Sequence, residues 1–214
     1  MTFRTFLVVT ILFFIYSGVQ AQEGSLPEND LKRAVVFGFN GLNISDFMGG
    51  VGYKTWIGSN SAVVLGVEFG YSESSEDSPE DDEYHPDSNS SRDRIGIYAE
   101  YQKHFSNENS LSPYTGIALQ TGWSGSSSSR TYPEQSDIPN SKRTSDMFSI
   151  TPGILLGFEY FLKSDISLSA QSYLNAAFSW GSDETNDGTN ITEIDRSEFN
   201  LTLGTSRLLL TVYF

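Results

Sequence analysis

The feature that most constrains the fold is an alternation of apolar and polar residues with a period of two. It recurs in segments of about ten residues, and no segment sustains the three-and-four spacing of an amphipathic helix. The clearest example covers residues 62–72, where Leu65 and Val67 alternate with Gly66 and Glu68. Because successive side chains of a strand point to opposite faces, this pattern predicts β-strands with one apolar face.

Eight such segments follow one another along the chain. We predict strands over residues 33–42, 51–57, 62–72, 92–104, 111–123, 147–162, 166–180 and 199–214. The last segment changes parity, because Phe199 and Leu203 lie on the face opposite to that of Leu208. One extra residue flips the face of a strand, so we predict a one-residue bulge near residues 204–206.

The connections between these segments differ sharply in length. Short connections are predicted at residues 58–61, 106–110 and 163–165. Long polar connections are predicted at residues 73–91, 124–145 and 181–196. Only the short connection at residues 43–46 departs from a strict alternation of long and short. This layout is typical of outer-membrane barrels, and the sequence predicts an all-β, eight-stranded, antiparallel up-and-down transmembrane β-barrel.

The alternation alone does not say which face of the barrel points outward. An apolar interior would make a secreted soluble barrel of the lipocalin type, whereas an apolar exterior would make a membrane barrel. The large side chains occupy the apolar face and the other face is rich in glycine, which suits the narrow interior of eight strands. Aromatic residues also gather near the predicted strand ends, where membrane-interface girdles lie. They are Tyr53, Trp56, Tyr71, Tyr101, Phe105, Trp123, Tyr160, Phe161, Trp180 and Phe214. We therefore expect the apolar face to point outward.

The N-terminus has the features of an export signal. Arg4 gives a positive start, residues 6–16 are almost entirely apolar, and Ala21 ends a small-residue cleavage pattern. The apolar run is too short to cross a bilayer comfortably, so we favour a cleaved signal over a membrane anchor. We predict a signal peptide at residues 1–21, a periplasmic segment at 22–32 and the barrel at 33–214.

Charge and cysteine content exclude several classes of function. The formal net charge is −14, which argues against a nucleic-acid partner because phosphate binding needs a basic face. The chain has no cysteine. This excludes a disulfide scaffold, a thiol nucleophile and a cysteine-ligated metal site. We expect no cofactor and no metal.

The end of the chain carries a more specific signal. Four apolar residues alternate on one face toward a terminal phenylalanine: Leu208, Leu210, Val212 and Phe214. This pattern resembles the C-terminal signature that the barrel-assembly machinery of Gram-negative bacteria recognises. Residues 32–214 as a whole resemble the small eight-stranded outer-membrane β-barrel family, which is OmpA- or OmpX-like. The resemblance implies a monomer in the cell outer membrane, with lipid around it and both termini in the periplasm.

Six charged residues of both signs fall on the polar face of the strands. They are Lys54, Glu68, Arg94, Glu100, Glu159 and Arg207. Buried charges must be paired, because an unpaired ion in a low-dielectric interior is very costly. The set is either an ion path of a small-solute channel or a network of salt bridges that plugs the lumen. We favour the plug, since eight strands leave little open space.

The connection at residues 73–91 carries eight carboxylates and no basic residue before Arg92. Its densest part is a run of four: Glu80, Asp81, Asp82 and Glu83. Such a cluster could bind divalent cations or a basic partner at the cell surface. The simpler interpretation, which we favour, is a solvated loop whose like charges repel one another.

Catalysis is not expected. A Ser/His/acid arrangement needs a histidine near the outer rim, and the chain has only His85 and His104. We expect His104 to be solvated or interfacial at the periplasmic end of its strand. The sequence therefore predicts a structural or surface-interaction protein that is not an enzyme. The alternatives are a small-solute channel and a soluble binding barrel.

Overall fold

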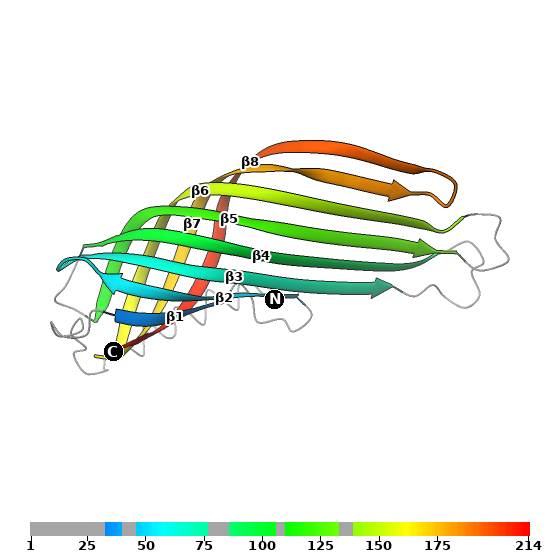
Figure 1. Cartoon of the computed structure of the whole chain (residues 1–214). Coiled ribbons are helices and arrows are strands. Elements are labelled where there is room, and N and C mark those ends of the chain that lie inside the picture. Colours follow the sequence, from blue (N-terminus) through cyan, green and yellow to red (C-terminus); the bar gives the residue numbers. More distant parts are fainter. Residues whose placement is uncertain (1–32, 40–45, 77–85, 106–109, 133–138) are drawn as a thin grey trace.

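The computed structural model describes residues 33–39, 46–76, 86–105, 110–132 and 139–214. Within these ranges the chain forms eight strands that close into a barrel (Figure 1). They are β1 (Arg33–Phe39), β2 (Asp46–Trp56), β3 (Ser61–Glu76), β4 (Asp87–His104), β5 (Leu111–Thr131), β6 (Ser141–Lys163), β7 (Ile166–Asn186) and β8 (Ile191–Tyr213). Each strand pairs antiparallel with its sequence neighbours, and β8 returns to pair with β1. The predicted all-β, up-and-down barrel is confirmed.

The strands extend much farther at one end than the sequence predicts. β5, β6 and β7 have 21, 23 and 21 residues, whereas β1 has 7. The prediction of long loops at 73–91, 124–145 and 181–196 is therefore wrong over most of their length. These stretches are polar on both faces, so they have no hydrophobic alternation. The hydrogen-bonded ladder continues through them because backbone groups pair regardless of side chain.

The barrel is closed at one end and open at the other. Among the described residues, the pairing of β1 with β8 ends at Phe39 and Leu208, and the pairing of β2 with β3 ends at Asp46 and Ser72. Beyond these points β3 to β8 continue as an open sheet (Figure 1). We call the part of the sheet beyond the paired row Phe69, Ile95, Trp123, Phe148, Trp180 and Ser197 the extension; it comprises residues 70–76, 87–94, 124–131, 141–147, 181–186 and 191–196. The remainder of the sheet is the closed barrel.

Two short turns lie at the end opposite the extension, as predicted. Residues 57–60 connect β2 to β3, and residues 164–165 connect β6 to β7. The short connection predicted at 106–110 lies almost entirely outside the described residues, as does that at 43–46. We call this the turn end of the barrel.

Residues 187–190 form the turn that connects β7 to β8 at the far end of the extension. Asp187 Oδ1 accepts backbone hydrogen bonds from Thr189 and Asn190, at 2.9 and 2.7 Å. Gly188 adopts a φ of 85°, a conformation that a residue without Cβ adopts at little cost. This tight turn takes the place of the long polar loop expected from the sequence.

A bulge in β8 confirms the explanation for its change of parity. Tyr173 of β7 faces Thr205, whereas the next residue, Leu174, faces Leu203. Gly204 is therefore the extra residue, inside the predicted window. The bulge returns Phe199 and Leu208 to the same outward face.

The two faces of the closed barrel are inverted relative to a soluble protein. Val67 and Phe69 on the outer wall are 49% and 48% exposed, whereas Glu68 between them is 6% exposed. Glu159 is completely buried. No helix among the described residues is long and apolar enough to cross a bilayer. The expectation that the apolar face points outward agrees with this burial pattern.

Two aromatic residues expected in the outer girdle lie inside instead. Trp56 shares the parity of the inward Lys54, and Phe161 shares that of Glu159. Phe161 is buried in an inner cluster with Ala34, and its ring centroid lies 5.9 Å from that of Tyr213. The expectation is wrong for these two residues because the alternation of faces, and not nearness to a strand end, decides which way a side chain points.

Candidate functional site

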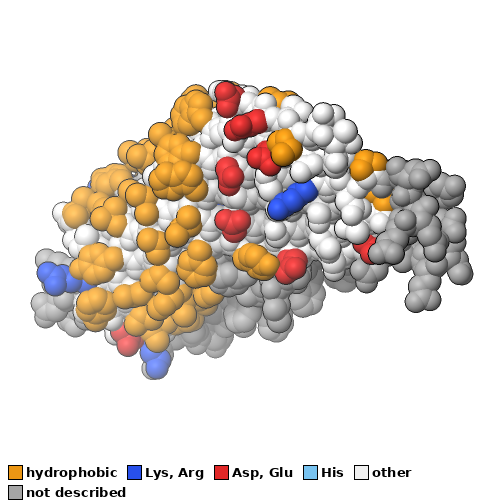
Figure 2. All heavy atoms as spheres, turned by 45° about the vertical axis from the view of Figure 1, so that its right-hand side comes forward, with side chains coloured by type: hydrophobic (Ala, Val, Ile, Leu, Met, Phe, Trp, Pro, Cys, Tyr) orange, Lys and Arg blue, Asp and Glu red, His pale blue; other side chains and the backbone are white. Residues whose placement is uncertain are grey.

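The outer wall changes character abruptly where the closed barrel meets the extension (Figure 2). The last apolar row crosses five strands and consists of Phe69, Ile95, Trp123, Phe148 and Trp180. The rings of Trp123 and Phe148 lie 4.8 Å apart, and those of Phe148 and Trp180 6.4 Å apart. Contacting aromatic rings from β5, β6 and β7 thus close the apolar wall on this side.

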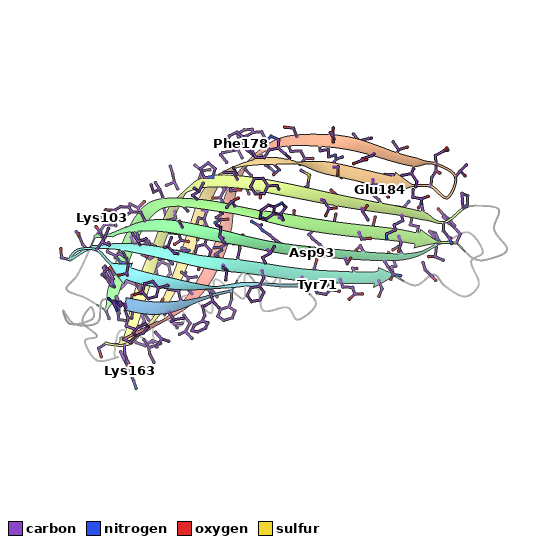
Figure 3. The ribbon with its side chains drawn as sticks, viewed as in Figure 1. Tyr71, Asp93, Lys103, Lys163, Phe178 and Glu184 are labelled. Carbon is purple, nitrogen blue, oxygen red and sulfur yellow. The ribbon has the colours of Figure 1, made fainter. Side chains whose placement is uncertain are left out.

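The next outward row, two residues farther along each strand, carries carboxylates. It consists of Tyr71, Asp93, Gly125, Asp146, Ser182 and Asp195. Figure 3 shows Phe178 at the apolar wall, with Tyr71, Asp93 and Glu184 on the extension. Lys103 and Lys163 lie at the turn end in the same view. The apolar wall is therefore a band bounded by charged residues on both sides.

The lumen near the turn end is built around Glu159. Lys54 Nζ lies 2.7 Å from Glu159 Oε2, and both side chains are almost completely buried. The hydroxyls of Ser167 and Tyr213 donate to Glu159 Oε1, at 2.5 and 2.6 Å. The carboxylate thus has three donors, which is what a fully buried anion requires. These groups come from β2, β6, β7 and β8, so they link opposite walls of the barrel.

His104 belongs to the same cluster, and the expectation that it would be solvated or interfacial is wrong. Its side chain is completely buried. His104 Nε2 lies 3.9 Å from Glu159 Oε2, and Nδ1 is hydrogen-bonded to Ser112 at 2.9 Å. The imidazole lies between Trp56 and Tyr114, with ring centroids 4.6 and 4.8 Å away. The even parity that His104 shares with Glu100 and Gln102 was the available signal.

Glu100 occupies the middle of the lumen and is held by neutral donors. Gln102 donates to its Oε2 at 2.9 Å. Tyr173 and Gln171 donate to its Oε1, at 2.6 and 3.2 Å. Tyr114 joins the network by donating to Gln171 at 2.8 Å. The middle layer is therefore a hydrogen-bonded network rather than an ion pair.

The layer nearest the extension is a triad of charges. Glu68 pairs with Arg207 through Oε2 and with Arg94 Nη2 through Oε1, the latter at 2.8 Å. The Arg207 guanidinium lies 5.4 Å from the ring centroids of both Tyr98 and Tyr173. Cations over aromatic faces are attracted by the ring quadrupole. This triad sits at the junction between the lumen and the extension.

The walls approach closely around these layers. A Cβ added at Gly66 would lie 2.6 Å from the Tyr98 ring, and one at Gly52 would lie 2.5 Å from the Tyr98 hydroxyl. These two positions thus make room for a tyrosine lying across the lumen. A cavity of about 20 Å³ lies beside Glu68 and Arg207, enough for about one water molecule.

The structure brings five of the six predicted charges together in two groups of ion pairs, and the sixth, Glu100, is held by neutral donors. Lys54 pairs with Glu159; Arg94 and Arg207 pair with Glu68; and Glu100 lies between them. The polar partners that the prediction omitted lie at lumen parity in the sequence, so the alternation could have found them. They are Gln102, His104, Ser112, Tyr114, Ser167, Gln171, Tyr173 and Tyr213.

Of the two other predicted sites, the structure describes only the C-terminal one. Leu208, Leu210, Val212 and Phe214 all lie on the outer wall at the turn end of β8. The acidic run Glu80, Asp81, Asp82 and Glu83 lies outside the described residues, as does the predicted signal peptide.

The inner face of the extension holds a second polar site. A hollow of about 630 Å³ is lined by serine hydroxyls and by Arg92, Arg143 and Arg196. Arg143 Nη2 and Arg196 Nε both contact Asp183 Oδ2, at 2.5 and 3.0 Å. Hydrogen bonds from Ser145 and Arg143, with Arg196 adding to them, hold the pKa of the Asp183 carboxyl below its ordinary value of 3.8. Asp183 therefore remains an anion that positions two arginines.

Comparison with solved structures finds similar folds at low sequence identity. A major outer membrane protein from Thermus thermophilus is 15% identical, with a TM-score of 0.49 over 87% of this chain and 100% of that one. Acinetobacter baumannii CarO is 10% identical, with a TM-score of 0.46 over 86% and 98% of the two chains. Acinetobacter baumannii CarO2 is 11% identical, with a TM-score of 0.45 over 87% and 100%. No protein-family model matches the sequence, and no curated protein matches it.

Proposed function

We propose that the protein is an integral outer-membrane β-barrel with a structural or surface-interaction role. The observation that carries the proposal is the apolar band on the outer wall, which surrounds a lumen filled with paired polar groups. Such a wall is stable only in contact with lipid, because exposing so much apolar surface to water is costly. Lipids of the outer membrane are therefore the partners of this surface.

The proposed orientation puts the turn end in the periplasm and the extension outside the cell. Barrels of this membrane have short periplasmic turns and longer outer segments, and the turns at 57–60 and 164–165 are short. The signature that ends at Phe214 lies at the turn end, where the periplasmic assembly machinery would meet it. The extension and the acidic connection that contains residues 80–83 would then be available to extracellular partners.

We further propose that the lumen is plugged and does not conduct steadily. Three layers of contacts, around Glu159, Glu100 and Glu68, cross the lumen. The cavity beside the Glu68 layer has room for about one water. Purified protein in planar bilayers should give no stable single-channel currents. Stable unitary currents would favour the channel alternative.

The proposed role is not catalytic, and a monomer is sufficient for it because the sheet closes within one chain. A His85→Ala substitution should leave the lipid composition of the host unchanged. A change in lipid structure detected by mass spectrometry would contradict a non-enzymatic role.

Cell fractionation combined with gel migration tests the proposal directly. The protein should co-fractionate with the outer membrane, require detergent for extraction and migrate anomalously until boiled. Recovery in the soluble fraction without detergent would favour the soluble binding barrel instead.

A further inference from the structure

In the extension, positively charged side chains gather on the inner face of the sheet and most negatively charged ones on the outer face. All five of its arginines have inward parity: Arg92, Arg94, Arg130, Arg143 and Arg196. Seven of its nine carboxylates have outward parity: Glu73, Asp87, Asp93, Asp146, Glu184, Glu193 and Asp195. The two inward carboxylates are Glu76 and Asp183. In an acidic protein of net charge −14, this makes the inner face of the extension a local positive surface.

Residues from β3 to β8 line the hollow on this face, so the sheet curves around it. Inward positions form rows across the strands, one of which runs through Arg92, Ser126, Ser145 and Asp183. Arg143 stands one inward position along β6 toward the hairpin end, and Arg196 stands on β8. Neighbouring strands lie about 4.8 Å apart, so Arg92 and Arg143 are roughly 10 Å apart across the sheet. Side chains of this length can reach a common ligand from both positions.

The guanidinium groups have donors to spare. Arg92 is exposed and has no ion-pair partner among the residues that the structure describes. Arg143 and Arg196 share the Asp183 carboxylate, Arg196 Nη1 also donates to Glu198 at 3.2 Å, and the two arginine side chains remain 51% and 45% exposed. Each guanidinium carries five N–H groups, and the contacts with Asp183 and Glu198 use only some of them. Asp183 thus fixes the two arginines in place without using up their capacity to bind an anion.

The positive groups of the hollow are all arginines, and its other lining groups are mainly hydroxyls. The outward lysine of the extension, Lys142, lies beside Arg143 in sequence but on the opposite face. Arginine presents a planar fork that matches phosphate and carboxylate geometry. Serines on β3 to β6, among them Ser90 and Ser126, surround these forks with groups that donate and accept hydrogen bonds. Glu73 at the rim is engaged by the Tyr71 hydroxyl at 2.9 Å.

We propose that the hollow of the extension binds an anionic saccharide. The phosphate or carboxylate of the sugar would be held by Arg92, Arg143 and Arg196, and its hydroxyls by the serines. The acidic outer wall of the same sheet would repel the ligand and so direct it to the inner face. The inference rests on the proposed function only for the placement of the extension outside the cell.

Calorimetric titration of purified, detergent-solubilised protein tests the binding itself. Glucose 6-phosphate and glucuronate distinguish a phosphate-bearing from a carboxylate-bearing ligand. Glucose alone tests binding of the sugar hydroxyls, and inorganic phosphate alone tests binding of the anion. At least one anionic sugar should bind saturably and more tightly than inorganic phosphate, and glucose should not bind. The affinity should fall with added salt, because the contacts are solvent-accessible charges.

Matched variants locate the site. Arg92→Gln should weaken binding about tenfold, the effect of losing one charge-assisted contact. Lys142→Gln removes the same charge from the opposite face and should change the affinity less than twofold. Arg143→Lys keeps the charge but loses the fork, and should weaken binding severalfold. Heat-modifiable gel migration verifies that each variant is folded.

Three results would overturn the proposal. They are the absence of saturable binding by both anionic sugars, equal losses in Arg92→Gln and Lys142→Gln, and inorganic phosphate binding at least as tightly as both sugars. None of these results bears on membrane location, which fractionation tests separately. Failure of the saccharide site and failure of the proposed function are therefore distinguishable.

Discussion

The closed barrel and the extension share the same strands and an unbroken backbone ladder, yet they sort their side chains by different rules. In the closed barrel, Leu65 and its outward neighbours are apolar, whereas most of the charged side chains point inward, among smaller apolar clusters. In the extension both faces are polar, and what alternates is the sign of charge, as in Arg92, Asp93 and Arg94. Hydrophobic alternation therefore indicates where a strand has one apolar face, and not how far the strand extends.

The largest expected contrast concerns ion pairs in the two regions. Lys54→Met leaves Glu159 buried without its cation and should reduce the free energy of unfolding by about 3–5 kcal/mol. Arg143→Met in the extension removes a half-exposed partner of Asp183 and should cost less than about 1 kcal/mol. Urea titration in lipid vesicles, followed by gel migration, measures both. The comparison fails if the two variants lose similar stability.

A second contrast concerns the outer wall. Leu65→Arg inserts a charge into the apolar band and should destabilise the folded barrel by about 2–4 kcal/mol. Asp93→Arg, in the carboxylate row of the extension, should change stability by less than about 0.5 kcal/mol. Unaltered stability of Leu65→Arg in lipid would mean that the wall does not face the bilayer.

A third contrast concerns the packing of glycine. An added methyl at Gly66 meets both the Tyr98 ring and the Val51 carbonyl oxygen at 2.6 Å, so Gly66→Ala should cost about 1–3 kcal/mol. At Gly125 the nearest atom is the Asp93 carboxylate at 2.8 Å, which can rotate away. Gly125→Ala should therefore be nearly neutral. Equal stabilities in the same urea titration would show that the lumen is looser than described.

The smallest contrast concerns how low pH affects the extension and the closed barrel. The pKa values of Asp183 and Asp187 are both lowered from 3.8, the former by Ser145 and Arg143 and the latter by backbone N–H groups of Asn190 and Thr189. A carboxyl with a lowered folded pKa stabilises the fold above its unfolded pKa, and this contribution is lost as the pH falls through the folded value. Amide exchange in the extension should thus stay slow down to about pH 4 and accelerate only below it, before exchange in the barrel does. Acceleration already at about pH 6 would contradict this account.

The sequence predicts the closed barrel well because one physical rule governs it. Alternation identifies all eight strands and the bulge at Gly204, and it puts Lys54 and Glu159 on the inner face. It does not predict that these two residues pair, because they are 105 residues apart and their contact depends on the register of the intervening strand pairs. His104 lies near a strand end, but its parity is that of the inward residues, and parity decides its burial.

The sequence predicts the extension poorly for the opposite reason. Serine-rich stretches such as residues 124–131 have no apolar face, so nothing distinguishes them from loops. Their strand structure depends on neighbours that are equally polar. The alternating signs at residues 92–94 were a visible signal of two distinct faces, but only the pairing across the sheet shows that every arginine falls on the same one.

The proposed function requires the outer wall of the closed barrel to face lipid and the outer wall of the extension to face water. Because the chain has no cysteine, single nitroxide labels can be attached to Leu119→Cys in the band and Asp93→Cys in the carboxylate row. In lipid vesicles, the label at position 119 should collide frequently with oxygen and rarely with a water-soluble nickel chelate, and the label at 93 should do the reverse. A label at position 119 that collides mainly with the nickel chelate would contradict the account.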